Sequence, residues 1–191
     1  MTKTRRGVLL LAGLLGAAPA ARADSPGDGV AGVVLRDPRG APVELAGLVR
    51  AHKLTVVVFY AATCPCFAAH VERLQRLAAD LGPRGVGFLV VDSERHAGGD
   101  PPAPAQIAPG LPVFHDEGGA LAHRLGARYA TESDVFDAAG RLRYRGGVDS
   151  DRKYLRPDAQ PYLRQALERL LAGDAPALTT TKALGCALRL F

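Results

Sequence analysis

Two cysteines separated by one proline, Cys64-Pro65-Cys66, are the residues whose types and spacing most directly indicate chemistry in this sequence. They follow the β-branched and aromatic run Leu54–Tyr60 and precede apolar residues at helical spacing. A thiol at the first turn of a helix lies beside unpaired backbone N–H groups and the positive end of the helix dipole, which favour the reactive thiolate. Pro65 suits that turn because it fixes φ and lacks an N–H. The pattern predicts a redox-active thiol pair, and the alternative is a pair of inert, buried cysteines.

A third cysteine, Cys186, lies in the segment that follows the last predicted helix. The stretch from Gly173 to Cys186 can extend over about 43 Å, which is enough to reach any part of a small domain. A disulfide between Cys64 and Cys66 would close a very small ring, and strained bridges are readily attacked by another thiolate. We therefore expect a flexible tail in which Cys186 is a possible resolving residue; the alternative is an idle thiol.

His70 follows Cys66 by four residues, so the two side chains share one face of a helix. Cys64, Cys66 and His70 form a weak candidate set for copper or zinc. The sequence has a single methionine, Met1, which weakens the case for copper. We expect no cofactor beyond the redox-active disulfide, with a copper-binding assembly factor as one alternative function. The remaining histidines have no selective spacing and are predicted to be surface residues: His52, His96, His115 and His123.

Hydrophobic patterning predicts the elements that position these residues. Leu54–Tyr60 and residues 86–91 are expected to be buried strands joined by a helix from Phe67 to Leu81, which makes a βαβ unit with parallel strands. Turn residues predict an edge hairpin near the N-terminus and an antiparallel hairpin later in the chain. The other expected elements are strands at 30–37, 42–45, Leu111–His115 (an edge strand), Ser133–Asp137 and 141–145, an irregular loop at 96–110, and helices at Ala120–Leu125 and 162–171, the last closed by Gly173.

This order of elements resembles the thioredoxin-like fold. Residues 59–64 resemble the thioredoxin segment that leads from an aromatic strand end to the first active-site cysteine. Residues 132–146 are similar to the hairpin of exported redoxins of the peroxiredoxin-like (alkyl hydroperoxide reductase/thiol-specific antioxidant) and thioredoxin-like families, and residues 181–186 resemble the tail of a bacterial redoxin subgroup. The resemblance spans about residues 27–190. It implies an α/β domain with a central mixed β-sheet flanked by helices and an N-terminal β-hairpin extension.

The resemblance also implies an enzyme, a thiol–disulfide oxidoreductase that exchanges with protein thiols and disulfides and with an upstream electron donor. It assigns Cys64 as the nucleophile and Cys66 as its partner, with Thr63, Pro65 and Thr131 as supporting residues. Thr131 aligns with the family's cis-proline, and a threonine strongly prefers the trans peptide.

Two departures separate this site from the family pattern. Phe67 stands where thioredoxins have their second cysteine, because the spacing here is Cys-x-Cys. Thr63 stands three residues before Cys66, as in peroxiredoxins, but Phe59 replaces the proline of that pattern. Peroxide reduction at Cys66, an antioxidant activity, is therefore the alternative enzymatic function.

The first 23 residues have the pattern of a signal peptide. Lys3, Arg5 and Arg6 precede an apolar run at 7–18, and the segment closes on Ala21-Arg22-Ala23, whose two small residues suit cleavage after Ala23. The run is shorter than the ~20 residues that span a bilayer, so an uncleaved anchor is the less favoured alternative. We expect export to the periplasm by the Sec route, or by the twin-arginine route through Arg5-Arg6. The expected domains are 1–23 (signal peptide), 24–173 (redoxin domain) and 174–191 (tail with Cys186).

Composition excludes other classes of protein. The 191 residues are 48% hydrophobic and 23% charged, which is typical of a globular protein. The net charge of +5 does not indicate a nucleic-acid-binding protein, because the chain beyond residue 23 has 20 basic and 19 acidic residues. No second apolar segment of spanning length follows, so we expect no stable membrane insertion after signal cleavage.

Overall fold

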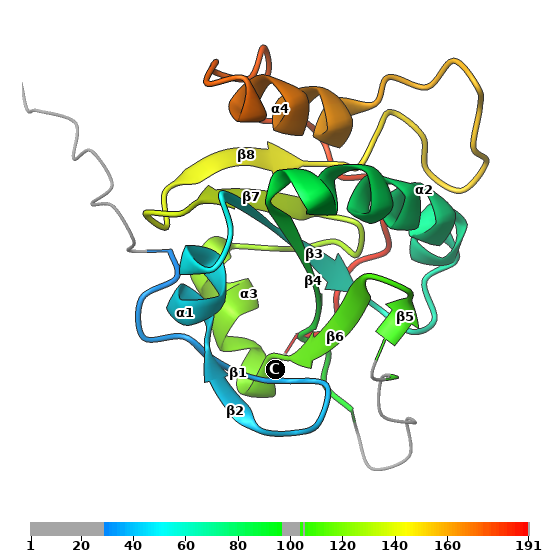
Figure 1. Cartoon of the computed structure of the whole chain (residues 1–191). Coiled ribbons are helices and arrows are strands. Elements are labelled where there is room, and N and C mark those ends of the chain that lie inside the picture. Colours follow the sequence, from blue (N-terminus) through cyan, green and yellow to red (C-terminus); the bar gives the residue numbers. More distant parts are fainter. Residues whose placement is uncertain (1–28, 97–103, 105, 191) are drawn as a thin grey trace, which may run out of the picture.

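The computed structural model describes residues 29–96, 104 and 106–190. The predicted signal peptide lies outside the described residues. Within them, two fully buried strands form the centre of the sheet, β3 (Leu54–Tyr60) and β4 (Val86–Asp92). They pair in parallel and are joined by α2 (Pro65–Leu81), which confirms the predicted βαβ unit (Figure 1).

The sheet extends outward from this unit on both sides. Its strand order is β2-β1-β6-β4-β3-β7-β8, with β5 paired to β6. β4 is parallel to β3 and β6, whereas the other pairs are antiparallel, so the predicted mixed sheet is confirmed. The remaining strands are β1 (Val34–Arg36), β2 (Pro42–Glu44), β5 (Gln106–Ala108), β6 (Leu111–His115), β7 (Ser133–Asp137) and β8 (Leu142–Gly146).

The predicted N-terminal hairpin is confirmed as β1 and β2 at one edge of the sheet. The prediction that Leu111–His115 is an edge strand is wrong. β6 lies between β4 and β1, because the hairpin extends the sheet beyond it through the pair Arg36 and His115. Its burial agrees with this interior place: Leu111 and Val113 are fully buried.

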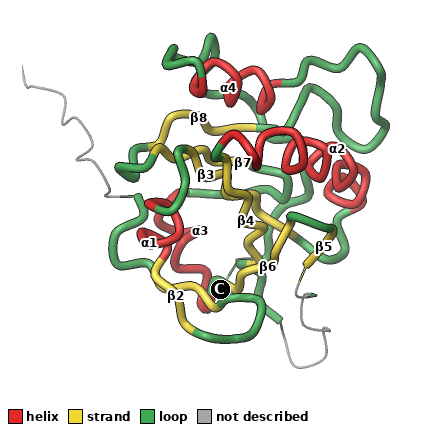
Figure 2. The backbone as a smooth tube through the Cα atoms, viewed as in Figure 1, coloured by secondary structure: helices red, strands yellow, loops and turns green. Residues whose placement is uncertain are grey.

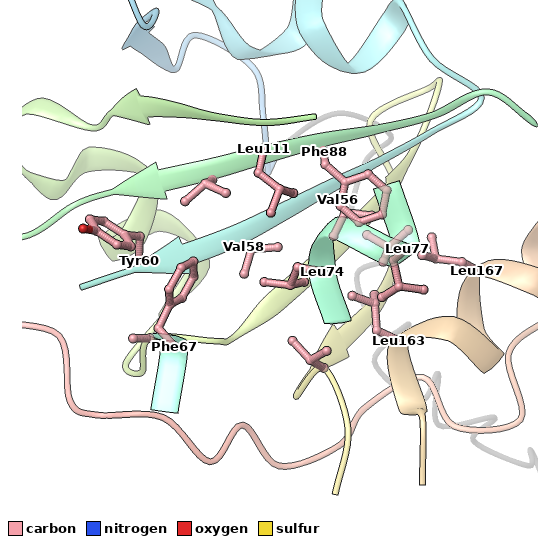
Figure 3. Close-up of a cluster of buried hydrophobic side chains, with 14 of the residues drawn as sticks. Val56, Val58, Tyr60, Phe67, Leu74, Leu77, Phe88, Leu111, Leu163 and Leu167 are labelled. Atoms are coloured by element: carbon pink, nitrogen blue, oxygen red, sulfur yellow. The ribbon is translucent and has the colours of Figure 1, made fainter. Parts of the chain in front are cut away.

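Helices cover both faces of the sheet. Alternate residues of β3 point to opposite faces: Val56 and Val58 pack in one cluster, and Val57 and Phe59 in the other. α2 and α4 (Tyr162–Leu171) contribute Leu74, Leu77, Leu163 and Leu167 to the first cluster, which Figure 3 shows in close-up. α1 (Leu45–Arg50) and α3 (Ala120–Leu125) contribute Leu45, Val49, Leu121 and Leu125 to the second. Two short 3-10 helices, η1 (Gly82–Arg84) and η2 (Glu117–Gly119), complete the set.

Two loop segments frame the N-terminus of α2. The segment 147–161, between β8 and α4, runs past α2 as a long loop (Figure 2). The segment after α4 is held against the body of the domain by two isolated β-bridges, Arg145 with Thr180 and Tyr129 with Ala187. The sequence predicts a flexible tail here. The structure instead has the tail held along β8 and along the loop that precedes β7, because its backbone pairs with residues far away in the sequence.

Candidate redox site

Cys64 is the N-cap residue of α2, at the end of the strand-to-helix turn that follows β3. Its backbone is extended, with φ −82° and ψ 109°, and Pro65 occupies the first helical turn. The backbone N–H of Phe67 donates a hydrogen bond to Cys64 Sγ across 3.3 Å. The sulfur therefore takes the place of the oxygen that usually caps a helix, and it lies where unpaired N–H groups favour negative charge.

The tail brings the third cysteine to this turn. The ligand atoms of Cys64, Cys66 and Cys186 all lie within 4.8 Å of one another, and all three are free thiols. The backbone N–H of Cys186 donates to Cys64 Sγ across 3.4 Å. Cys64 and Cys66 are 2% and 3% exposed, whereas Cys186 is half-buried. The structure thus brings together the three cysteines that the sequence singles out.

Backbone pairing and close packing hold Cys186 in position. Ala130 N–H donates to the Cys186 carbonyl, and Leu188 N–H to the Arg128 carbonyl, each across 2.9 Å. Gly185 packs directly on the turn that precedes β7: a Cβ at this position would lie 1.5 Å from the carbonyl oxygen of Ala130. Only glycine fits this approach, so residue 185 fixes the placement of the neighbouring thiol.

Side chains anchor the tail on each side of Cys186. Upstream, Thr181 Oγ1 shares a hydrogen bond of 2.7 Å with the buried Tyr144 hydroxyl. Downstream, the Arg189 guanidinium pairs with the buried Glu94 carboxylate across 3.1 Å. Sequence reasoning missed Gly185, Thr181, Arg189 and Glu94 as contributors to the site. A glycine directly before the third cysteine is the one local signal among them.

Cys64 and Cys186 differ in their affinity for protons. Burial alone would raise the pKa of Cys64, but hydrogen bonds from the Cys186 thiol, from Phe67 N–H and from Cys186 N–H outweigh it, so the pKa is lowered. Burial, together with the hydrogen bond and charge of Cys64, raises the pKa of Cys186 to about 12. Cys64 is therefore the more readily ionised thiol of this pair.

The predicted supporting residues have different surroundings. Thr131 is buried beside the tail, has φ 72°, and donates its backbone N–H to the Phe59 carbonyl across 2.9 Å. The described residues contain no cis peptide bond, as the threonine predicts. Thr63 is exposed, and in the described part of the chain no hydrogen bond joins its hydroxyl to a sulfur. Thr131 therefore shapes the tail's seat, whereas Thr63 has no visible link to the thiols.

His70 does not face the sulfurs as a free ligand. Its side chain is 2% exposed, with Nδ1 2.7 Å from the Cys66 carbonyl oxygen and Nε2 3.1 Å from Asp149 Oδ1. Asp149 also pairs with Arg73. Both imidazole nitrogens thus have hydrogen-bond partners, so His70 is a buried helix histidine and not a free metal ligand. Among the described residues, the group able to hold a metal ion is Cys64, Cys66 and Cys186.

A groove opens beside the sulfurs at the surface. It is lined by Pro65 and Cys66 at the start of α2, by Leu184 and Cys186 of the tail, and by residues 150–154 with Arg156 of the loop between β8 and α4. Cys64 does not line this groove. A molecule entering it therefore meets Cys66 and Cys186 before Cys64.

Comparison with solved structures identifies the fold. An uncharacterized conserved protein from Geobacillus kaustophilus is 26% identical, with a TM-score of 0.74 over 83% of this chain and 88% of that chain. A hypothetical protein from Sinorhizobium meliloti 1021 is 23% identical, with a TM-score of 0.68 over 83% and 90%. The exposed lipoprotein thioredoxin Etrx1 of Streptococcus pneumoniae is 21% identical, with a TM-score of 0.54 over 71% and 96%. The fold is thioredoxin-like.

Peroxiredoxin Q of Xanthomonas campestris is also among the matched structures of this thioredoxin-like domain. These likenesses confirm the fold that the sequence resemblance implies. Neither a family model nor a curated protein matches the chain. In the part of the thioredoxin-like chain that the structure describes, no helix is both long enough and apolar enough to cross a bilayer.

Proposed function

We propose that this protein is an exported thiol–disulfide oxidoreductase in which the Cys64 thiolate is the nucleophile. The observation that carries the proposal is the setting of Cys64 Sγ, which accepts two backbone N–H groups and has two further thiols within 4.8 Å. A stabilised thiolate is the attacking species in disulfide exchange, and an adjacent thiol is needed to release the product.

The reaction follows from these contacts. The Cys64 thiolate attacks one sulfur of a substrate disulfide, the S–S bond breaks, and the other sulfur leaves as a thiolate. A second protein thiol then attacks Cys64 in the mixed disulfide and releases the second substrate thiol. Cys66 or Cys186 serves in this step, which leaves one disulfide in the protein and two reduced thiols in the substrate. An upstream electron donor returns the protein disulfide to two thiols.

The chemistry asks for no cofactor beyond these sulfurs. Protein thiols and disulfides are the proposed substrates, and the periplasm is the proposed location because disulfides persist there. Peroxidase activity is the weaker alternative, since Thr63 is exposed and, in the described part of the chain, its hydroxyl makes no hydrogen bond to Cys66.

A single-turnover experiment tests the proposal. Reduced protein is mixed with bis(2-hydroxyethyl) disulfide, and the released 2-mercaptoethanol is counted. We expect two equivalents from the wild type, and one from the double variant Cys66→Ser/Cys186→Ser, which stops at the mixed disulfide. Cys64→Ser is expected to release at least roughly a hundredfold more slowly. Release from Cys64→Ser at the wild-type rate would remove Cys64 from the nucleophile's role.

A further inference from the structure

The groove beside the sulfurs gives unequal access to the three thiols. Cys186 is half-buried and lines the groove, whereas Cys64 is 2% exposed and does not. In a disulfide between these two residues, Cys186 Sγ is the sulfur that faces an incoming molecule. Access decides which sulfur of a disulfide is attacked, so an external thiolate reaches Cys186.

The leaving group favours the same direction of attack. When a thiolate attacks Cys186 Sγ, the sulfur that departs is Cys64, whose pKa is lowered by hydrogen bonds from the backbone N–H groups of Phe67 and Cys186. A thiol of lower pKa leaves faster. Attack at Cys64 would instead expel Cys186, and burial raises the pKa of that thiol. Exposure and leaving-group chemistry therefore agree on Cys186 as the sulfur that is opened from outside.

The wall that the loop between β8 and α4 contributes to the groove is basic. Arg152 and Lys153 are exposed, and within the described ranges neither has a carboxylate within 4 Å. The acid in this wall, Asp151, is buried and already paired with Arg73 and Arg156. The unneutralised charge at the mouth of the groove is thus positive, which raises the local concentration of anions.

Other groups near this wall do not reverse its sign. Lys153 Nζ lies 5.1 Å from the ring centre of Tyr154, which is 80% exposed. Asp158 is exposed, and its charge interacts with the Arg156 guanidinium. Arg152 and Lys153 remain without an acidic partner. Together with Tyr154, they give the groove an exposed cationic and aromatic edge, and the half-buried Cys186 lines the same groove.

We infer that the groove admits an anionic thiol, such as a carboxylate-bearing one, which attacks Cys186 Sγ in a Cys64–Cys186 disulfide. This inference rests on the proposed function. The incoming thiolate forms an S–S bond with Cys186 and the Cys64–Cys186 bond breaks, so Cys64 departs as a thiolate. A second molecule of the thiol, as its thiolate, then attacks the sulfur of the first in the mixed disulfide; the bond to Cys186 breaks, Cys186 leaves as a thiolate, and the two thiol molecules depart joined by a disulfide. Arg152 and Lys153 select the thiol by its charge and take no part in bond breaking.

The test compares three thiols of different charge on one protein disulfide. The Cys66→Ser variant is oxidised so that Cys64 and Cys186 are the two remaining cysteines, and the wild type is treated in parallel. Reduction by 3-mercaptopropionate, 2-mercaptoethanol and cysteamine is followed, with each rate divided by the thiolate fraction at that pH. We expect the anionic thiol to exceed the cationic one by roughly fivefold or more at low salt, and the ratio to fall toward one at 1 M salt, where the Debye length is about 3 Å.

A pair of matched variants locates the effect. Arg152→Gln/Lys153→Gln is expected to abolish the ordering by charge, whereas Arg39→Gln/Arg50→Gln, which removes two exposed charges near the N-terminal hairpin, keeps it. Acid quenching followed by peptide mapping is expected to find the thiol bound to the tail peptide with Cys186, not to the peptide with Cys64.

The outcomes separate this inference from the proposed function. If 2-mercaptoethanol reduces the disulfide but the three corrected rates are equal, or the bound thiol maps to Cys64, the anionic groove is refuted and exchange stands. If the Cys66→Ser variant forms no intramolecular disulfide, the Cys64–Cys186 pair is refuted. If no thiol reduces the oxidised wild type, the proposed function itself fails.

Discussion

The backbone N–H of Cys186 donates a hydrogen bond to Cys64 Sγ across 3.4 Å, although 122 residues separate the two cysteines in sequence. This contact makes the tail part of the site's architecture rather than an appendage to it. The same segment supplies a thiol, a backbone donor and a cover for the buried sulfur.

Gly185 tests whether the seated tail matters for the chemistry. Gly185→Ala places a Cβ 1.5 Å from the Ala130 carbonyl oxygen, so the tail must move. We expect formation of the Cys64–Cys186 disulfide to slow by roughly tenfold or more, since misplacing a reacting group by about 1 Å costs up to ~10²-fold. The matched control is Gly47→Ala, where no atom lies within 4 Å. Equal rates in both variants would show that the seat is dispensable.

The pH dependence of Cys64 alkylation tests its hydrogen bonds. The Cys186 thiol donates to Cys64 and so favours its thiolate, which lowers the pKa of Cys64. In Cys186→Ala this donor is lost, and we expect the midpoint of alkylation by iodoacetamide to move to higher pH. Cys66→Ala serves as the comparison that leaves the Cys186 donor in place. A midpoint that is lower or unchanged in Cys186→Ala would contradict the assignment of the thiolate.

The buried Asp149 carboxylate is expected to make the stability of the protein depend on pH. Burial opposes its charge, but hydrogen bonds from His70 and Arg73 outweigh burial and lower its pKa. A carboxyl with a depressed folded pKa stabilises the protein above the unfolded value of about 3.9, and this stabilisation is lost as pH falls through the folded pKa. Asp149→Asn is therefore expected to cost about 1–3 kcal/mol near pH 7 and much less at pH 3.

Urea unfolding of Asp149→Asn and wild type across this range measures that difference. Asp174→Asn, at an exposed acid, is the control that leaves the buried pair intact. A stability difference that is the same at pH 7 and pH 3 would mean that the charge of Asp149 does not support the fold.

Hydrogen peroxide separates exchange from peroxidase chemistry. The hydroxyl of Thr63 makes no hydrogen bond to Cys66 in the described part of the chain, so no visible group activates a peroxide there. We expect peroxide to oxidise the protein slowly, at a rate that Thr63→Val leaves unchanged within about twofold. Stopped-flow consumption of peroxide measures it. A fast burst that depends on Cys66 and Thr63 would establish the peroxidase alternative.

Metal binding is expected to depend on the tail cysteine and not on the helix histidine. Thiolates suit Cu(I), and His70 already has both nitrogens engaged by Cys66 and Asp149. In titrations against a competing Cu(I) chelator, we expect Cys186→Ser to lower the affinity by roughly tenfold or more, and His70→Ala to change it by less than about threefold. The reverse ranking would favour the set Cys64, Cys66 and His70.

The buried sheet was accessible to sequence reasoning because its signals are local. The run Leu54–Tyr60 and the helical spacing after Cys66 each predict their element without reference to the rest of the chain. The sequence does not predict α1, because this helix has only six residues and no side-chain cap at Glu44. Burial of Leu45 and Val49 stabilises it instead. The sequence predicts β6 at an edge, whereas β6 lies between β1 and β4. Strand order depends on tertiary pairing, which a single run of residues does not encode.

In the candidate site too, features set by local sequence can be predicted, and features set by tertiary contacts cannot. The turn at Cys64 follows from the sequence, since a strand end, a proline and a helix leave one place for the thiol. The partner of His70 does not, because Asp149 lies 79 residues away. The seat of Cys186 likewise depends on Ala130 and on the Arg189–Glu94 pair, which no spacing rule connects to the tail.

The long separation between Cys64 and Cys186 also orders the events of folding. During synthesis from the N-terminus, every strand of the sheet emerges before the tail, so Cys64 and Cys66 are present together while Cys186 is still missing. Closing so large a loop has a high entropic cost, and it can happen only after every strand of the sheet has been made. Newly made molecules therefore pass through a stage in which the adjacent cysteines are uncovered, and any protection of their thiols at that stage must come from outside the chain.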